Sequence, residues 1–150
     1  MQQIIVEESA VIGAPASKVY DVIADYRNGH PNIVPKKYFK SVEIEYGGVG
    51  AGTIIRVVTQ FLGREQHYRM LVEEPDQGKV ISERDLKTGT VTYFTIKEGK
   101  NKGESIVTIK TEMPIASGLK GMIEKLTTPP MMKKIYREEL AQLNSFVSLN

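Results

Sequence analysis

Turn-forming sequences recur at short intervals through the middle of the chain, from Tyr38 to Met113. The turn signals are the glycine-containing stretches YGGVGAG, LGRE, PDQGK, KTGT and EGKNKGE, and segments of strand length separate them. Regular turns at this spacing are typical of an antiparallel meander. A further strand is predicted at Gln3–Ile12, which is rich in Ile and Val and is followed by Gly13.

One face of the predicted meander is more apolar than the other. Alternate side chains of a strand share one side of the sheet, so a strand with one buried face alternates between apolar and polar residues. The apolar parity consists of Ile55, Val57, Thr59, Phe61, Tyr68, Met70, Val72, Phe94, Ile96, Val107, Ile109, Thr111 and Met113. We predict that this parity forms the concave face, with His67 on the outer face.

The segment after the first strand predicts a helix. Pro15 suits a first helical position, where its missing N–H is harmless. Apolar residues then recur at the spacing of one helix face: Val19, Val22, Ile23 and Tyr26. The helix is expected to end by Asn28–Gly29, and a turn or very short second helix is expected from His30 to about Pro35.

A long amphipathic helix is predicted at the end of the chain. Thr128 can cap this helix, and Pro129 and Pro130 suit its first positions. Its apolar face consists of Met132, Ile135, Tyr136, Leu140, Leu143, Phe146 and Val147. Such a helix packs its apolar face on the preceding sheet. The segment Ser117–Leu126 is expected to form a separate turn of helix.

Composition limits the classes of function. The 20 Lys and Arg residues nearly balance the 18 Asp and Glu residues, which argues against nucleic-acid binding, where clustered positive charge is expected. The chain has no cysteine, so disulfides and thiolate sites are excluded. Its two histidines, His30 and His67, lie on separate elements without metal-ligand spacing. We therefore predict no metal and no cofactor.

The chain of 150 residues is expected to form one domain, residues 1–150. Its N-terminus lacks the basic start and apolar core of a signal peptide, and no later segment is apolar over the length of a bilayer. We expect a cytoplasmic protein without stable membrane insertion. The sequence does not indicate an oligomeric state.

The order of elements resembles the START-like, helix-grip (SRPBCC) superfamily, which includes the polyketide cyclase/dehydrase family. The resemblance covers nearly the whole chain, and its most specific part is the pattern Ala-Pro-x-x-x-Val-Tyr-x-x-Ile-x-Asp at residues 14–25. It implies an α+β fold in which a curved antiparallel sheet of about seven strands surrounds a long C-terminal helix. Two short helices follow the first strand. A hydrophobic cavity is expected between the sheet and the last helix.

This resemblance and the apolar parity together predict the residues of a ligand-binding site. The predicted lining consists of Ile55, Val57, Tyr68, Met70, Phe94, Thr111, Met113, Met132 and Tyr136. Two charged residues complete the prediction. Glu139 interrupts the apolar face of the last helix, and Arg84 is assigned inward by the resemblance. Because an unpaired charge in an apolar interior is costly, the two are expected to form a structural ion pair or to anchor a ligand. A helix rotation that exposes Glu139 is the alternative.

Three functions are compatible with these features. The leading prediction is binding or transport of a small hydrophobic molecule that carries a polar group, such as a lipid, a quinone or a polyketide-like compound. The second is a polyketide cyclase or dehydratase with a cavity acid or base, for which Glu139 and then His30 are the catalytic candidates. The third is a protein-interaction or quinone-chaperone role. Binding is favoured over catalysis because the sequence shows no acid–base pair. The alternative to a catalytic role for His30 is a turn residue at the cavity mouth.

Overall fold

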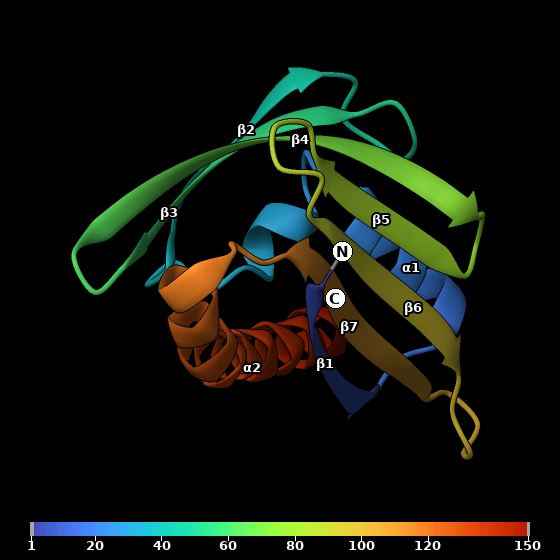
Figure 1. Cartoon of the computed structure of the whole chain (residues 1–150). Helices are drawn as coiled ribbons and strands as arrows, with labels where there is room; N and C mark the ends of the chain where they lie inside the picture. Colours follow the sequence, from blue (N-terminus) through green and yellow to red (C-terminus); the bar gives the residue numbers. More distant parts are fainter. Residues whose placement is uncertain (1, 150) are drawn as a thin grey trace.

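The computed structural model describes residues 2–149 and consists of one antiparallel sheet and three helical elements. The chain starts with β1 (Gln3–Ile12), α1 (Ala16–Ala24) and the short 3-10 helix η1 (His30–Asn32). Six strands and a long helix follow: β2 (Phe39–Tyr46), β3 (Ile54–Phe61), β4 (Arg64–Asp76), β5 (Val80–Asp85), β6 (Val91–Glu98), β7 (Ser105–Pro114) and α2 (Gly118–Leu149). Figure 1 shows the sheet curving around one side of α2. The predicted helix-grip architecture is confirmed.

The sheet is a meander that β1 extends at one edge. Its strand order is β1-β7-β6-β5-β4-β3-β2. Paired residues of antiparallel strands point to the same side, so the register defines which residues share the inner face. One row crosses five strands of this face: Val6, Thr111, Thr92, Glu83 and Val72. Met70 and Met113 lie two residues along their strands from this row and therefore face the same side.

The orientation of β5 differs from the prediction. Glu83 pairs with Val72 of β4 and Thr92 of β6, so Glu83 faces inward and Arg84 faces outward. The resemblance assigns the opposite parity, with Arg84 inward, and the alternation itself does not decide because both sides of this strand carry polar residues. In addition, the register shifts between Glu73 and Asp76 opposite the start of β5. Such an irregularity interrupts the two-residue period. The side of the sheet that a β5 residue faces therefore cannot be deduced by counting along the sequence from β4.

The last helix begins earlier than predicted. It runs without a break from Gly118 to Leu149 and contains Pro129 and Pro130 in its interior. These prolines have no N–H for the carbonyls of Lys125 and Leu126, and their rings crowd the preceding turn, which bends a helix rather than starting one. Figure 1 shows α2 changing direction between its orange first part and its red second part.

The β2–β3 connection holds the segment that follows α1. Tyr26 N donates to Gly48 O at 2.9 Å, and Gly50 N donates to Ala24 O at 2.9 Å. The guanidinium of Arg27 donates to Gly47 O at 2.6 Å. Gly48 has φ 147°, and a Cβ there would lie 2.2 Å from Arg27 Nε, so glycine is required. These bonds fix the backbone on both sides of Tyr26.

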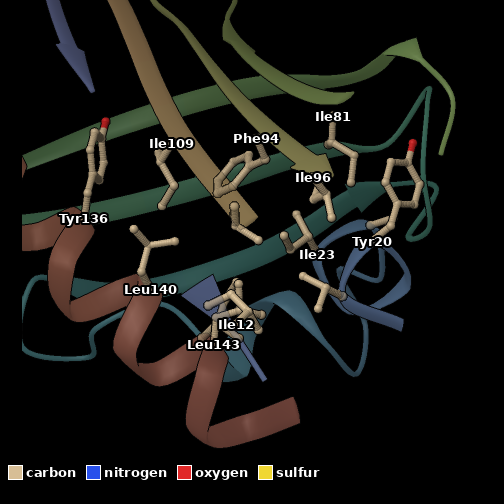
Figure 2. Packing of buried hydrophobic residues seen from close by; sticks show 14 of the residues in the cluster. Ile12, Tyr20, Ile23, Ile81, Phe94, Ile96, Ile109, Tyr136, Leu140 and Leu143 are labelled. Atoms are coloured by element: carbon tan, nitrogen blue, oxygen red, sulfur yellow. The ribbon is translucent and has the colours of Figure 1, made fainter. Parts of the chain in front are cut away.

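The apolar core fills one end of the space between the sheet, α1 and the second part of α2. Figure 2 shows Leu140 and Leu143 of α2 pointing toward Phe94 and Ile109 of the sheet. These four side chains are at most 2 % exposed. At the other end, Met132 of α2 and three inner-face residues of the sheet are only partly buried: Tyr68, Met70 and Met113. Solvent therefore reaches the inner face of the sheet at this end.

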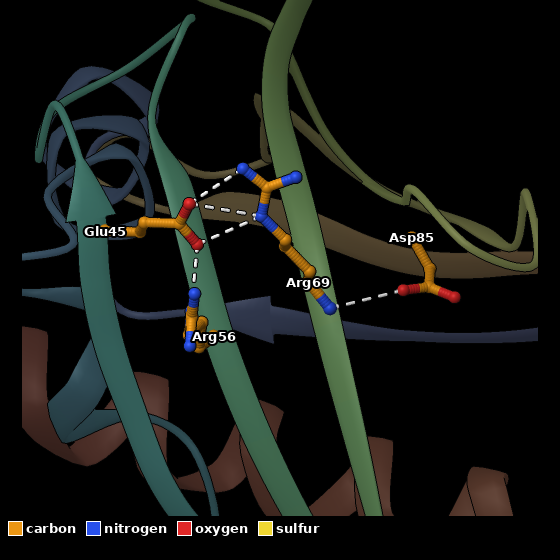
Figure 3. A network of polar contacts seen from close by, with 4 residues as sticks. All are labelled: Glu45, Arg56, Arg69 and Asp85. Atoms are coloured by element: carbon orange, nitrogen blue, oxygen red, sulfur yellow. Dashed lines mark hydrogen bonds and ion pairs between the residues drawn. The ribbon is translucent and has the colours of Figure 1, made fainter.

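The outer face of the sheet carries a charged network across β2, β3 and β4. Arg56 and Arg69 lie directly opposite each other, a placement that is unfavourable for like charges. Glu45 accepts hydrogen bonds from both arginines, as Figure 3 shows. The bonds from Arg69 and then Arg56 lower the pKa of Glu45 to about 2. The exposed side of these strands is thus occupied by ion pairs.

Candidate functional site

Four ionisable side chains meet inside the apolar core: Tyr26, His30, Glu83 and Glu139. We call this group the polar cluster. Tyr26 follows α1, His30 begins η1, Glu83 lies on the inner face of β5, and Glu139 lies on the apolar side of α2. None is more than 9 % exposed. The cluster therefore combines elements from the beginning, middle and end of the chain.

Distances in the polar cluster indicate direct interaction. Tyr26 Oη donates to Glu83 Oε1 at 2.6 Å. His30 Nε2 lies 3.4 Å from Glu83 Oε1 and 3.8 Å from Glu139 Oε1. The imidazole of His30 stacks on the ring of Tyr26 at 4.5 Å and meets the ring of Phe94 edge-on at 5.3 Å. The aromatic rings thus hold the imidazole between the two carboxyl groups.

The protonation of His30 follows from its backbone contact. Its Nδ1 lies 2.8 Å from the carbonyl oxygen of Ile23, and a carbonyl oxygen only accepts hydrogen bonds. Nδ1 therefore carries a proton, and Nε2 is the ring atom that faces the carboxyl groups of Glu83 and Glu139. The polar cluster therefore places an imidazole beside two carboxyl groups, the side-chain types that general acid–base chemistry uses.

Burial controls the electrostatics of this cluster. Loss of solvation raises the pKa of Glu139 well above its ordinary value, and the negative charge of Glu83 adds to this increase. The pKa of Tyr26 is also raised, first by burial and then by the charge and hydrogen bond of Glu83. Glu139 therefore tends to keep its proton, which makes it a potential hydrogen-bond donor inside the protein.

A chain of hydroxyl groups lies beside the polar cluster. The hydroxyls of Thr92 and Thr111 are 2.7 Å apart, and Thr111 also bonds the hydroxyl of Tyr136. Thr92 pairs with Glu83 across the strands, and Tyr136 lies three residues before Glu139 on α2. Polar groups thus continue from the cluster toward the half-buried part of the inner face.

The structure distributes the predicted site residues over two environments. Six are buried: Ile55, Val57, Phe94, Thr111, Tyr136 and Glu139. Four are partly buried: Tyr68, Met70, Met113 and Met132. His30 begins a 3-10 turn as predicted, but its side chain is 3 % exposed and points inward rather than to the surface. His67 is exposed on the outer face, as predicted.

Two residues of the cluster are absent from the sequence prediction of the site. Tyr26 appears there only as an apolar helix-face residue, and nothing in the local pattern marks its hydroxyl as buried. Glu83 is missed because the prediction places the other side of β5, the side with Arg84, on the inner face. The one available signal is that two alternate residues of this strand, Glu83 and Asp85, are acidic. Asp85 is also buried, but it accepts hydrogen bonds from Thr88 N and Thr88 Oγ1 and caps the β5–β6 turn.

The predicted inward orientation of Arg84 is wrong. Its guanidinium lies 3.0 Å from Glu73 Oε1 on the outer face, and both side chains are more than 40 % exposed. The predicted partnership of Arg84 with Glu139 is therefore replaced by that of His30 with Glu139. Water solvates Arg84, so its charge needs no buried partner.

Replacing Arg84 with alanine should therefore change stability little. Exposed ion pairs contribute about 0.2–1 kcal/mol, and the guanidinium has no contact with the polar cluster. Urea denaturation of Arg84→Ala and of Glu73→Ala is expected to show similarly small losses of unfolding free energy. The loss in the double variant should equal the sum of the two single losses minus the energy of the ion pair. A loss of several kcal/mol would contradict the outward placement.

Two surface depressions lie outside the predicted lining. One, of about 430 Å³, lies between α1 and the end of α2 and includes Lys18, Asp21 and Phe146. The other, of about 510 Å³, lies on the outer face of β6 and β7 and includes Tyr93, Lys97 and Lys110. Neither includes a residue of the polar cluster, and a cavity beside Met132 stays a prediction.

Within residues 2–149, no three His, Cys, Asp or Glu side chains are grouped so that they could hold a metal ion. Over the same part of the chain, no helix has the length and apolar character needed to cross a membrane.

Comparison with known proteins identifies relatives along almost the whole chain. Residues 3–146 match the family model "Polyketide cyclase / dehydrase and lipid transport". The NMR solution structure of the KanY protein is 27% identical, with a TM-score of 0.85 and 99% of each chain covered. No curated protein sequence matches the chain.

Two more distant structures share the fold. A START superfamily protein from Mycobacterium smegmatis is 13% identical, with a TM-score of 0.74, and the match covers 95% of this chain and 98% of that one. The Zhui aromatase/cyclase from Streptomyces sp. R1128 is 17% identical, with a TM-score of 0.73, and the match covers 98% of this chain and 94% of that one.

Proposed function

The chain belongs to the polyketide cyclase/dehydrase and lipid transport family, and on this basis we propose that it binds a small hydrophobic molecule carrying a polar group. The proposed site lies between the inner face of the sheet and α2. The observation that carries the proposal is the polar cluster inside the apolar core, next to inner-face residues that solvent reaches.

The apolar part of the ligand would contact the half-buried residues Tyr68, Met70, Met113 and Met132. Methionine side chains are flexible and polarisable, so they adapt to ligands of irregular shape. Pockets of this kind are mostly apolar and contain a few polar groups that orient the ligand. The same side chains are partly exposed without ligand, and their burial would contribute to the binding free energy.

The polar group of the ligand would approach the hydroxyl of Tyr136 and the carboxyl group of Glu139. A protonated Glu139 donates a hydrogen bond to a carbonyl oxygen, which the raised pKa of this residue favours. The hydroxyls of Thr111 and Tyr136 can each donate or accept. These groups support a preference for a ligand with a carbonyl or hydroxyl group over a pure hydrocarbon.

A second candidate function is catalysis of enolisation, as a step of cyclisation or dehydration. The specific observation in its favour is that His30 Nε2 faces Glu83 and Glu139. In this reaction His30 Nε2 would take a proton from the carbon next to a carbonyl group, and Glu139 would donate its proton to the carbonyl oxygen. The products are an enol, an imidazolium and a carboxylate. Turnover that depends on pH and is lost in Glu139→Gln would identify an enzyme, whereas a carrier would bind without forming product.

Ligand binding can be tested with a steric variant. Met132→Trp is expected to weaken binding of a bulky ligand by about tenfold or more, since overpacking costs about 1–3 kcal/mol. Fluorescence titration or calorimetry with a panel of lipids, quinones and aromatic polyketides would measure this. Lys134→Trp is the matched control, because Lys134 lies on the same helix but is exposed.

Two results would contradict the proposal. Equal affinities of the Met132→Trp and Lys134→Trp variants would exclude this part of α2 from the site. Failure of the unmodified protein to bind any member of the panel would remove the support for a hydrophobic ligand altogether.

A further inference from the structure

The first part of α2 exposes an apolar helix face. Its apolar residues lie at the i, i+3, i+4 and i+7 positions that form one side of a helix. They are Leu119, Met122, Ile123 and Leu126, with exposed fractions of 72%, 65%, 53% and 76%. We call these four residues the apolar stripe. Single exposed apolar residues are common, but a contiguous group of large ones marks an interaction surface.

Contacts on the opposite side of the helix direct the apolar stripe outward. Gly121, on the other side of this helical segment, is buried, and a Cβ there would lie 1.7 Å from Ala116 O. Glu124 also turns back toward the β7–α2 connection, where its Oε2 accepts from Ala116 N at 3.4 Å. The side with Gly121 and Glu124 thus faces the β7–α2 connection, and the apolar stripe lies on the opposite side of the helix.

The bend at the prolines separates this segment from the packed part of α2. Residues from Tyr136 to Val147 make the buried face of the helix, and α2 packs chiefly on β1, with smaller contacts to α1 and η1. Before Pro129 the helix has taken another direction, as Figure 1 shows for its orange part. The apolar stripe is therefore not part of the surface that packs on the sheet.

The charges around the apolar stripe are predominantly positive. Lys120 and Lys125 lie on its two flanks, and Lys133 and Lys134 follow the prolines. All four are exposed. Glu124 is the one acidic residue from position 118 to position 134. An apolar stripe between lysines matches the acyl region and the anionic headgroups of a lipid surface.

We propose that the first part of α2 docks on the surface of an anionic lipid membrane. The helix would lie in the plane of the interface, with the apolar stripe in the acyl boundary and the lysines among the headgroups. A lipid surface fits better than a protein because lysine is depleted in protein interfaces. A second copy of the chain would also bring like charges together. This docking goes beyond ligand binding and does not require it.

Vesicle sedimentation tests the proposal with the full chain. The protein should sediment with phosphatidylcholine vesicles that contain phosphatidylglycerol, and much less with phosphatidylcholine alone. The double variant Leu119→Ser/Leu126→Ser should lose at least tenfold in partitioning. Lys120→Glu/Lys125→Glu should lose about fivefold or more for each lysine, because each contributes through the surface potential.

Matched controls separate docking from general effects. Ile5→Ser/Val11→Ser removes two apolar residues that are similarly exposed on the outer side of β1, and it should leave partitioning unchanged. Lys100→Glu/Lys102→Glu alters two exposed lysines of the β6–β7 connection, and it should have a much smaller effect than reversal of Lys120 and Lys125. Circular dichroism would confirm that each variant is folded.

Several outcomes would overturn the proposal. These are no sedimentation with any vesicle, equal binding to neutral and anionic vesicles, or equal losses in the stripe and control variants. A dimer in solution that Leu126→Ser dissociates would show that a second copy occupies the stripe instead. Ligand affinity measured without vesicles should be the same for the stripe variants and the unmodified protein, so failure of docking and failure of ligand binding are distinguishable.

Discussion

Replacing Glu83 with alanine is expected to destabilise the protein by about 3 kcal/mol or more. The substitution leaves the buried hydroxyl of Tyr26 without its 2.6 Å acceptor and removes the carboxylate nearest to His30. Unsatisfied buried polar groups each cost about 1–3 kcal/mol. Removal of the buried Glu83 carboxylate also removes its desolvation cost, so we expect the lower end of the range for a broken buried pair. Urea denaturation would measure the change.

The control for this prediction is Glu73→Ala. Glu73 is also a strand glutamate paired with a basic residue, but its side chain and that of Arg84 are exposed. Its replacement should cost less than about 1 kcal/mol. Glu83→Gln should fall between the two, because the amide oxygen still accepts from Tyr26 but carries no charge. Equal losses for Glu83→Ala and Glu73→Ala would contradict the role assigned to Glu83.

Glu139 is expected to make stability fall as pH rises. In the unfolded chain its pKa is about 4.5, and in the folded protein burial and Glu83 raise it well above that value. Between these two pKa values the folded state holds a proton that the unfolded state has released. Unfolding then releases a proton, and the free energy of unfolding decreases by up to about 1.4 kcal/mol per pH unit. The loss begins near pH 4.5 and is complete at the folded pKa.

Glu139→Gln should remove this slope, because the amide resembles the protonated carboxyl group. The difference in unfolding free energy between Glu139→Gln and the unmodified protein should grow in favour of the variant from pH 4.5 upward. His30, Glu83, Tyr26 and Tyr136 surround Glu139 in both proteins, so the difference between the two stability curves isolates the contribution of Glu139. Denaturation at several pH values would measure it.

Glu138→Gln supplies the control, since it makes the same chemical change on a neighbouring side chain that is only partly buried. Its curve should run nearly parallel to that of the unmodified protein. If the Glu139→Gln difference is constant with pH, Glu139 does not hold a proton in the folded state. The donor role proposed for it in ligand binding would then be untenable.

Local sequence patterns determined most of the fold. The bounds of β1 match the prediction, and the short helix at His30 was expected from its Gly and Pro neighbours. The inner parity of β3, β4, β6 and β7 follows directly from the two-residue period of apolar residues. These features depend on residues close to one another along the chain, so a single sequence contains the information.

Tertiary structure decided the polar cluster and the course of α2. Tyr26 and His30 meet Glu83 and Glu139 only because the register of β5 and the packing of α2 bring distant segments together. The local pattern of β5 fits either face, and only its pairing with β4 and β6 shows that Glu83 is on the buried side. Similarly, Pro129 and Pro130 fit a helix start or a bend equally well. The sequence alone predicts an apolar sheet face and an amphipathic helix that packs on it. Strand register and tertiary packing determine which charged groups lie between the sheet and the helix.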